Sequence, residues 1–396
     1  MKASATAIDE GTAYGLPKTS HDAELTGVGA GTPMGELLRR YWHPVGLAED
    51  AGATPRQVRV LGEDLILFRD GAGRPGLVHP RCVHRGASLY YGRIEAAGIR
   101  CCYHGWMFDV EGRCLDQPCE PEGGKLRANV RQPWYPLEER YGLVFAYLGP
   151  PDRKPLLPRI DVLDELGPGE MLEADDSSIG GGGPAVIPCN WLQHYENVVD
   201  SFHVPILHGV FSGHQFVPAM AQMPAVEWSA TERGVRVTSW RTLDDGRRLH
   251  RVTEAAMPTL RVVPSPRLGS FGPVESIGWV LPIDDTHFRI YVAGRVALAG
   301  DIGRMRSKMN GKLWSELSES EHRQFPGDYE AQTSQGSIAS HSAEHLRTSD
   351  RGVAMLRRFL REQLARVAAG DDPACVVRGD GDATLRFTDC GNFIAP

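Results

Sequence analysis

Short apolar runs separated by turn-forming residues fill the N-terminal part of the chain. The runs QVRVLG and DLILFRD, and the run at 143–148, have the length and composition of β-strands. Glycine and proline clusters between these runs interrupt any helical period. The pattern predicts a small antiparallel β module at 36–152, preceded by an N-terminal arm at 1–35.

The rest of the chain, 153–396, mixes strand-like and helix-like patterns. A proline-rich passage, GPPDRKPLLPRI, precedes it and favours an extended connection between two domains. Apolar alternation in VEWSATERGVRVTSW, LRVVP and SIGWVLPIDDTHFRIYVAGRV predicts strands. Helical spacing predicts helices at 191–200, 302–321 and 350–369. We therefore expect an α+β domain, with helices packed against an antiparallel sheet.

Composition and charge exclude several classes of function. The 396 residues include 43 Lys and Arg against 50 Asp and Glu, giving a net charge of −7 without a long basic run. Nucleic acid is therefore not an expected partner. No apolar stretch approaches the roughly 20 residues of a membrane span, and the N-terminus lacks the apolar core of a signal peptide. We expect a cytoplasmic protein with no membrane partner.

Cysteine and histidine gather in one part of the N-terminal module. Five of the 8 cysteines lie between positions 82 and 119. Cys82 and His84 form one Cys-x-His pair, and Cys101 and His104 form a second pair after a 16-residue gap. Two such pairs can hold a two-iron cluster, with both sulfurs on one iron and both imidazoles on the other. We expect Cys102 to be only a packing neighbour.

Two other interpretations of this first constellation remain open on the residues alone. A structural zinc site is one, although zinc sites normally use paired C-x2-4-C spacing. Buried cysteines and histidines that are adjacent by chance are the other. Zinc binding would make the chain a binding protein without redox activity.

A second constellation lies in NWLQHYENVVDSFHVPILHG. On a helix, Asn197, Asp200 and His203 share one face, so a carboxylate adjoins a potential metal ligand. His203 and His208 would point roughly 140° apart on a regular helix, too far for one metal ion. Pro205 lies between them and would kink or end the helix, which can bring the rings together. The alternative is a pair of histidines that cap or pack at a helix end.

At this point the chain resembles a known family. Cys-x-His, the gap and CCYHGWMFD resemble the Rieske [2Fe–2S] domain. Rieske proteins of respiratory complexes carry a disulfide over the cluster, but Ala87 and Tyr103 stand at those positions here. The segment N-x2-D-x2-H-x4-H resembles the iron-binding motif of Rieske non-heme iron oxygenases, in which both histidines bind a mononuclear Fe(II).

The resemblance also implies a third iron ligand. The segment DYEAQTSQGSIASHSAEHLRTSDRGV resembles the phthalate dioxygenase-like branch, where its leading carboxylate, Asp328 here, completes a 2-His-1-carboxylate triad. Glu330 is the alternative ligand. The resemblance gives no ligand role to His194, His341 or His345.

The resemblance further implies a fold and a reaction. It implies an all-β Rieske domain followed by a catalytic domain of the helix-grip type, assembled as a homotrimer or a dimer of trimers. In that assembly Asp200 would bridge His104 of one subunit to an iron-ligand histidine of the next, with Asn197 beside it. The chain would be an oxygenase component that uses O2 to hydroxylate or O-demethylate a small aromatic compound, often a carboxylate.

Electrons for such a reaction must come from outside this chain. It has no G-x-G-x-x-G motif after a strand, so NAD(P)H would act through a separate reductase, with or without a ferredoxin. The competing hypothesis is a non-catalytic Rieske electron carrier that uses only the first constellation. That hypothesis leaves the second constellation and most of the second domain unexplained.

Overall fold

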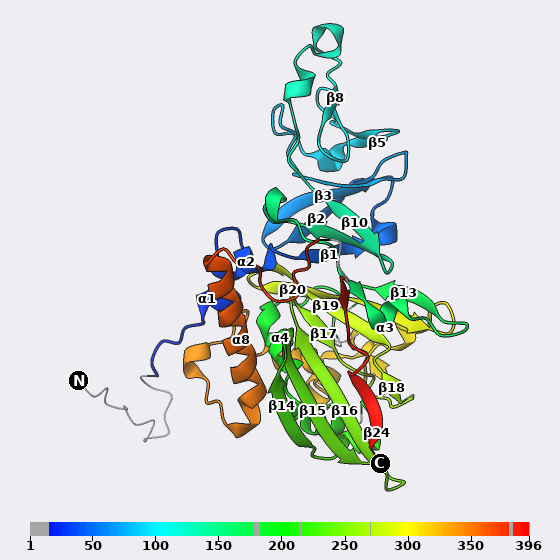
Figure 1. Ribbon diagram of the computed structural model, residues 1–396, viewed down its shortest axis with the longest axis vertical. Coiled ribbons are helices and arrows are strands. Elements are labelled where there is room, and N and C mark those ends of the chain that lie inside the picture. The colour runs from blue at the N-terminus through cyan, green and yellow to red at the C-terminus, as the bar shows by residue number, and fades with distance from the viewer. Residues whose placement is uncertain (1–15, 178–182, 214, 270, 380–382, 396) are drawn as a thin grey trace, which may run out of the picture.

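The computed structural model describes residues 16–177, 183–213, 215–269, 271–379 and 383–395. The molecule is elongated, with small β-sheets at one end of its long axis and a larger α+β body at the other (Figure 1). Residues 1–15 of the predicted arm lie outside the described residues. No helix in the described ranges is both long and apolar enough to cross a membrane.

Three small antiparallel sheets form the N-terminal part, and the predicted strands in QVRVLG and DLILFRD are confirmed. A tight turn with positive φ at Leu61 and Gly62 joins those two strands, β2 and β3. The three sheets comprise β1 (Trp42–Leu47), β11 (Leu143–Tyr147) and β10 (Leu137–Arg140); β2 (Arg56–Val60), β3 (Glu63–Arg69), β4 (Pro75–Val78) and β9 (Trp134–Tyr135); and β5 (Arg93–Glu95), β6 (Gly98–Arg100), β7 (Met107–Phe108) and β8 (Cys114–Asp116).

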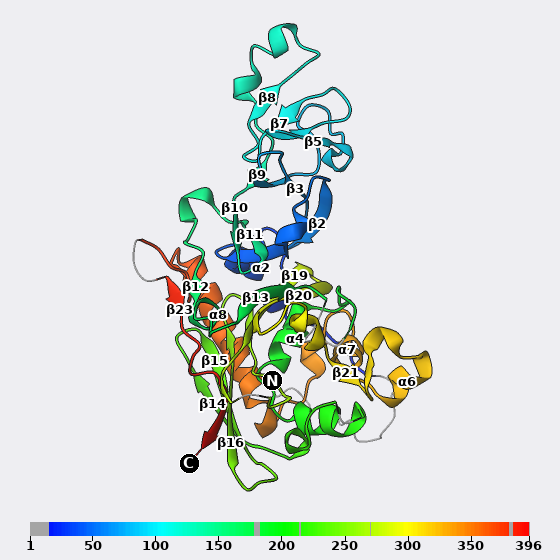
Figure 2. The same cartoon turned by 90° about the vertical axis from the view of Figure 1, so that its right-hand side faces the viewer.

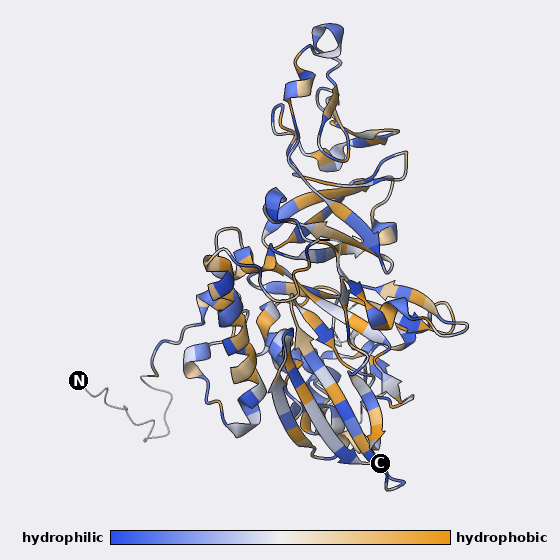
Figure 3. Cartoon of the chain, in the orientation of Figure 1, coloured by the Kyte–Doolittle hydropathy of each residue, from blue (hydrophilic) through white to orange (hydrophobic). Residues whose placement is uncertain are grey.

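A large antiparallel sheet forms the C-terminal part, as predicted. Its order is β13-β20-β19-β17-β16-β15-β14, and β24 pairs with β16 and β18. Figure 3 shows hydrophobic and hydrophilic bands alternating along these strands. The strands are β13 (Met171–Asp175), β14 (Ala225–Ala230), β15 (Gly234–Thr242), β16 (Arg248–Ala256), β17 (Leu260–Val262), β18 (Gly272–Pro273), β19 (Ser276–Asp284), β20 (His287–Val296) and β24 (Gly391–Ala395).

Helices lie against this sheet and beside the N-terminal segment. The predicted helix at 350–369 is confirmed as α8 (Arg351–Ala368), which packs on β15 and β14. Figure 2 shows α4 and α7 in the same lower body of the molecule. The other helices are α1 (Ala23–Thr26), α2 (Pro33–Leu38), α3 (Asp161–Asp164), α4 (Trp191–Asn197), α5 (Asp301–Arg304), α6 (Glu319–Gln324) and α7 (Asp328–Thr333).

The predicted helix at 302–321 is wrong. The described chain forms the four-residue α5 there, then a short hairpin of β21 (Lys308–Met309) and β22 (Lys312–Leu313). Asn310 and Gly311, at the hairpin turn, have φ of 46° and 78°. An Asn-Gly pair with positive φ at both residues favours a tight hairpin turn over a helix.

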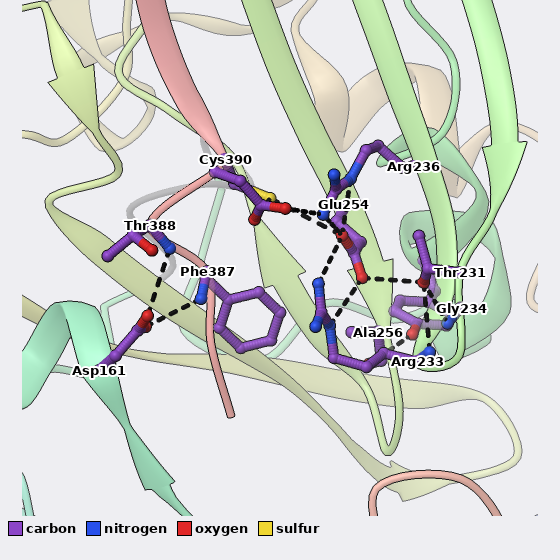
Figure 4. Close-up of polar contacts among 12 residues, drawn as sticks. Asp161, Thr231, Arg233, Gly234, Arg236, Glu254, Ala256, Phe387, Thr388 and Cys390 are labelled. Atoms are coloured by element: carbon purple, nitrogen blue, oxygen red, sulfur yellow. Dashed lines mark hydrogen bonds and ion pairs between the residues drawn. The ribbon is translucent and has the colours of Figure 1, made fainter. Parts of the chain in front are cut away.

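Strand β16 was not predicted, because charged residues interrupt its apolar positions. Glu254 of β16 is fully buried and binds Arg233 and Arg236 (Figure 4). In the same region Asp161 accepts the backbone N–H groups of Phe387 and Thr388, ahead of β24 (Figure 4). These contacts fix the C-terminal segment, and β24 pairs with the far end of β16.

The described residues form two apolar cores, and only the smaller one is confined to the N-terminal part. A small cluster surrounds the first constellation and includes Ile66, Phe68 and Phe108. The larger core runs from β1 and β11 into the large sheet, so the first small sheet shares its core with the C-terminal body. The domain boundary between 152 and 153 stays a prediction.

Candidate metal centres

Two loops with the same backbone pattern carry the first constellation. In each loop the cysteine N–H donates to the carbonyl of the residue five positions later, with an N···O distance of 2.8 Å. A glycine four residues after the cysteine donates back to the cysteine carbonyl, and its φ is positive, as glycine permits without strain. The bonds are Cys82 N to Ala87 O, Gly86 N to Cys82 O, Cys101 N to Trp106 O, and Gly105 N to Cys101 O.

The loops bury their sulfurs and leave their imidazoles nearer to solvent. Cys82 and Cys101 are 2% and 4% exposed, and burial together with the neighbouring Cys101 thiol raises the pKa of Cys82. The His84 and His104 rings lie 4.7 Å apart between centroids. Cys102 is exposed. A paired set of two buried thiols and two adjacent imidazoles fits a Rieske cluster, whose iron would favour the thiolate form.

Polar side chains hold both loops from behind. The buried amide of Gln132 accepts the Val83 N–H at 3.0 Å and donates to the Arg81 carbonyl at 2.9 Å. Arg100 donates to the Gly105 carbonyl at 2.5 Å. The loops are thus fixed by bonds that do not involve the cysteine sulfurs or the imidazoles.

The helix predicted at 191–200 ends early, at Asn197 of α4. Asp200 lies in the following turn, where its Oδ1 accepts the N–H groups of Phe202, at 2.7 Å, and His203, at 3.3 Å. Its other oxygen, Oδ2, lies 3.3 Å from His203 Nδ1. The expected juxtaposition of Asp200 and His203 therefore arises from a helix-capping turn and not from a continuous helical face.

A π-helix, Val204–Phe211, follows this turn. Its hydrogen bonds join residues five apart and its turns are wider than those of an α-helix, so positions i and i+5 lie nearer to the same face. His203 precedes this helix, and its ring centroid lies 5.2 Å from that of His208. We expected a kink at Pro205 to bring the rings together; Pro205 instead occupies the first turn, and the wider helix does so.

Asp328, the first residue of α7, faces both histidines. Its Oδ1 lies 3.4 Å from His208 Nε2 and 3.9 Å from His203 Nε2, and candidate ligand atoms of all three lie within 4.8 Å of one another. Burial opposes ionisation of Asp328, but His208 and His203 hold its pKa well below the usual value. Two imidazoles and one carboxylate around a common point form the donor set of a mononuclear iron site.

Each of these side chains is oriented by a further polar group. Asn197 Nδ2 donates to Asp328 Oδ1 at 3.1 Å, and Gln215 Oε1 lies 2.5 Å from His208 Nδ1. With acceptors beside the Nδ1 atoms, the Nε2 atoms of His203 and His208 are the nitrogens that face Asp328. Ligand histidines are commonly held in this way, so the residues present fit an iron ion.

The other candidates do not belong to the described group of converging ligand atoms. Glu330 accepts the Trp314 indole N–H at 2.8 Å and lies 2.9 Å from His322 Nδ1, and it does not belong to the group of converging ligand atoms. His194 is buried, and burial lowers its pKa to about 4. His341 accepts a backbone N–H of the N-terminal segment at 2.8 Å, and His345 is exposed.

A cavity of ≈ 520 Å³ opens directly beside the triad. Its lining includes the triad, Asp200, and three arginines that were not among the predicted site residues: Arg241, Arg251 and Arg261. The available signal was a charged residue within each strand-like run. A charge in a strand does not reveal by itself which face of the sheet it occupies.

Comparison with known proteins gives clear matches. The model of the Rieske [2Fe-2S] domain matches residues 41–136. Phenoxybenzoate dioxygenase subunit alpha of Ectopseudomonas oleovorans is 50% identical over 387 residues, covering 97% of this chain and 94% of that protein. The tert-butanol monooxygenase / tert-amyl alcohol desaturase oxygenase subunit of Aquincola tertiaricarbonis is 38% identical, covering 92% and 81%. Phthalate 4,5-dioxygenase oxygenase subunit of Pseudomonas putida is 31% identical, covering 86% and 84%.

Solved structures show the same fold. NdmB of Pseudomonas putida CBB5 superposes with a TM-score of 0.62 at 20% identity, covering 91% of this chain and 98% of that chain. Dicamba monooxygenase bound to dicamba gives a TM-score of 0.60 at 16% identity, covering 84% and 99%. At these identities the likeness concerns the fold alone.

Proposed function

The chain belongs to the Rieske non-heme iron oxygenase family, as an oxygenase component, and we propose that it oxygenates an aromatic carboxylate of the phenoxybenzoate type. The observation that carries the proposal is the cluster of His203, His208 and Asp328 beside a ≈ 520 Å³ cavity. A non-catalytic Rieske electron carrier needs neither these three side chains nor the cavity. The substrate class is supported by the relative that shares 50% identity over 97% of this chain.

The proposal assigns two cofactors to two sets of side chains. When bound, the [2Fe–2S] cluster supplies single electrons, and the mononuclear iron supplies the site for O2 activation next to the substrate. The proposed cluster ligands are Cys82, His84, Cys101 and His104, and the proposed iron ligands are His203, His208 and Asp328.

The protein's own contribution is orientation and enclosure. Asn197 holds the side chain of Asp328 in position, and Gln215 holds that of His208. The cavity walls hold the aromatic ring beside the triad and limit access of water. Electrons come from NAD(P)H through a separate reductase, because this chain lacks a nicotinamide or flavin motif.

We also propose that the chain works as a head-to-tail homotrimer, alone or as a dimer of trimers. The β5–β8 sheet and α4 lie in opposite parts of one chain in two perpendicular views (Figures 1 and 2). Apolar side chains are exposed near both constellations, as an interface between them requires. They are Val83, Tyr90, Tyr91 and Tyr103 near the first, and Ile206, Val210 and Phe211 on the π-helix.

Oxygen consumption tests the proposed reaction. The iron-loaded protein, mixed with a reductase, NADH and phenoxybenzoate, should consume O2 and yield a hydroxylated product that contains oxygen from labelled O2. Light scattering should give about three, or about six, times the 43.4 kDa chain mass. Oxidation of NADH without oxygenated product from any aromatic carboxylate would contradict the proposed reaction.

A further inference from the structure

Three arginines share one face of the large sheet. Arg251 of β16 lies directly opposite Ser239 of β15, and Arg241 is two residues further along β15. Arg261 of β17 lies opposite Ala255, four residues along β16 from Arg251. Directly paired residues, and residues two apart on a strand, point to the same face. That face is the cavity wall, which all three arginines line.

Burial makes these charges costly unless an anion accompanies them. Arg241 and Arg251 are 4% and 7% exposed. Within the described ranges none of the three forms an ion pair with a carboxylate, although the buried Arg357 binds both Glu196 and Glu344. The sheet therefore holds three positive charges without matching negative ones.

Neutral oxygen atoms accept hydrogen bonds from some of the N–H groups of these arginines. Arg241 donates to Gln222 O and Ser239 Oγ, and Arg251 donates to the carbonyls of Pro264 and Ser265 and to Asn392 Oδ1. The Nε of Arg261 is buried and has no acceptor within the described residues. Donors thus remain for a ligand, chiefly on Arg261.

The three guanidiniums also act on one another. Burial, followed by repulsion from Arg241 and Arg261, lowers the pKa of Arg251 to about 9. Burial lowers the pKa of Arg241 to about 10. Arg261 in turn interacts with the charge of Asp328. Arg251 is therefore within electrostatic range of both other arginines, and Arg261 links this group to the triad.

The sheet backbone leaves room for Arg261 at one point. Gly278 of β19 pairs with Arg261, and a Cβ added to Gly278 would lie 2.5 Å from Arg261 Cγ and 2.8 Å from its Cδ. The aliphatic part of Arg261 therefore lies across the glycine. Any larger residue would displace it from that position.

The rest of the cavity suits an aromatic anion. With the three arginines included, six Lys and Arg residues stand against three Asp and Glu residues in the described lining, and two of the acidic ones, Asp200 and Asp328, face histidines. Apolar side chains complete the wall and can contact a ring, among them Val198, Phe216, Met220 and Val263.

We propose that Arg241, Arg251 and Arg261 form an anion site that binds the substrate carboxylate and thereby sets which part of the ring faces the iron. This inference rests on the substrate class of the proposed function and names the residues that select it. Guanidinium forks match a carboxylate in two parallel hydrogen bonds, so the site fixes orientation as well as charge.

Calorimetric titration under anaerobic conditions, without reductase, tests this site in the iron-loaded protein. Phenoxybenzoate is the probe, and phenoxybenzamide is its uncharged counterpart. Arg261→Met and Arg251→Met should each weaken phenoxybenzoate binding at least about tenfold, as expected for loss of a charged hydrogen bond. Binding of phenoxybenzamide should change by less than about threefold. Arg261→Met should also keep the wild-type melting temperature, because Arg261 Nε has no acceptor within the described residues.

A matched control separates this effect from a general loss of positive charge. Arg247, in the exposed turn between β15 and β16, pairs with Asp245 and is not among the cavity residues. Arg247→Met should bind phenoxybenzoate as the wild type does. Equal binding by all three variants would overturn the anion site while leaving the proposed function intact. If the wild type binds neither phenoxybenzoate, phthalate nor chlorobenzoate, the substrate class itself is overturned, and the anion site with it.

Discussion

At the residue scale, the two proposed iron-ligand histidines differ in what lies behind them. His203 has the Asp200 carboxylate near its Nδ1, whereas His208 has the neutral amide of Gln215. A carboxylate makes the imidazole more basic, and it can also carry electrons between the imidazole and a group outside the site. A neutral amide only fixes the orientation of the imidazole ring. His203 is therefore the histidine that Asp200 can connect to a neighbouring subunit, and His208 is the one whose ring Gln215 holds in place.

Gln215 is the simplest place to test that support. Gln215→Leu removes the acceptor from His208 Nδ1, so the ring loses its fixed orientation, and we expect iron affinity to fall about 10- to 100-fold. Competition with a chelator, followed by iron analysis, measures this loss. Gln222→Leu is the control, because the Gln222 side chain is exposed and only its backbone carbonyl is used. Equal iron retention in both variants would contradict the role of Gln215.

The chemistry of single residues was the most predictable part of the sites. Cys82, Cys101 and the histidine pairs stand out through residue type and spacing alone. Arg251 does not, because its meaning depends on the neighbouring strands and on the lack of a carboxylate nearby. Such properties arise only when the sheet forms.

At the element scale, prediction succeeded where one pattern dominated. The strands β2, β3 and β19 and the helix α8 follow their apolar periods. The π-helix was not predictable, because it differs from an α-helix in hydrogen-bond register and not in residue pattern. The short β21–β22 hairpin was not predicted, because its Asn-Gly turn lies inside a stretch with helical spacing.

Strand β1 contains a buried histidine, His43, that should make the free energy of unfolding depend on pH. His43 is fully buried, and burial, with the nearby Arg39 charge, lowers its pKa from 6.5 to about 4. Since the unfolded chain takes up this proton first, stability is complete above about pH 6.5 and is lost as pH falls toward 4. The loss from this group is about 3 kcal/mol.

Urea unfolding at pH 7 and pH 4.5 measures this effect. His43→Gln should remove much of the difference between the two pH values, because glutamine carries no titrating group. His345→Gln, at an exposed site, should behave as the wild type does. If His43→Gln shows the wild-type loss, another group causes the acid sensitivity.

At the scale of the whole molecule, the two centres lie in separate parts of the chain (Figure 1). His104 is near the surface of one part, and Asp200 lines the cavity in the other. Neither the long axis nor the exposed apolar side chains near both centres followed from the sequence pattern. Together they support the proposed homotrimer, since a neighbouring chain could bring the two proposed centres together.

Asp200→Asn tests the proposed bridge between subunits. Asparagine keeps an oxygen that can accept the His203 N–H, so the capping turn should remain, but the negative charge is lost. We expect both metal centres to stay loaded and cluster oxidation in a single turnover with substrate and O2 to slow about 10- to 100-fold. Rapid-mixing spectroscopy of the pre-reduced protein gives this rate. An unchanged rate would show that electrons do not pass through Asp200.

Iron and sulfide analysis can establish whether the chain holds both proposed metal centres. It compares the anaerobically purified wild type with its His203→Ala variant, with His345→Ala as the control. We predict about three irons and two sulfides per chain in the wild type and the control. The His203→Ala variant should lose about one iron and keep its sulfide and its visible cluster spectrum. Two irons in all three proteins, or zinc in place of iron, would contradict a two-centre oxygenase.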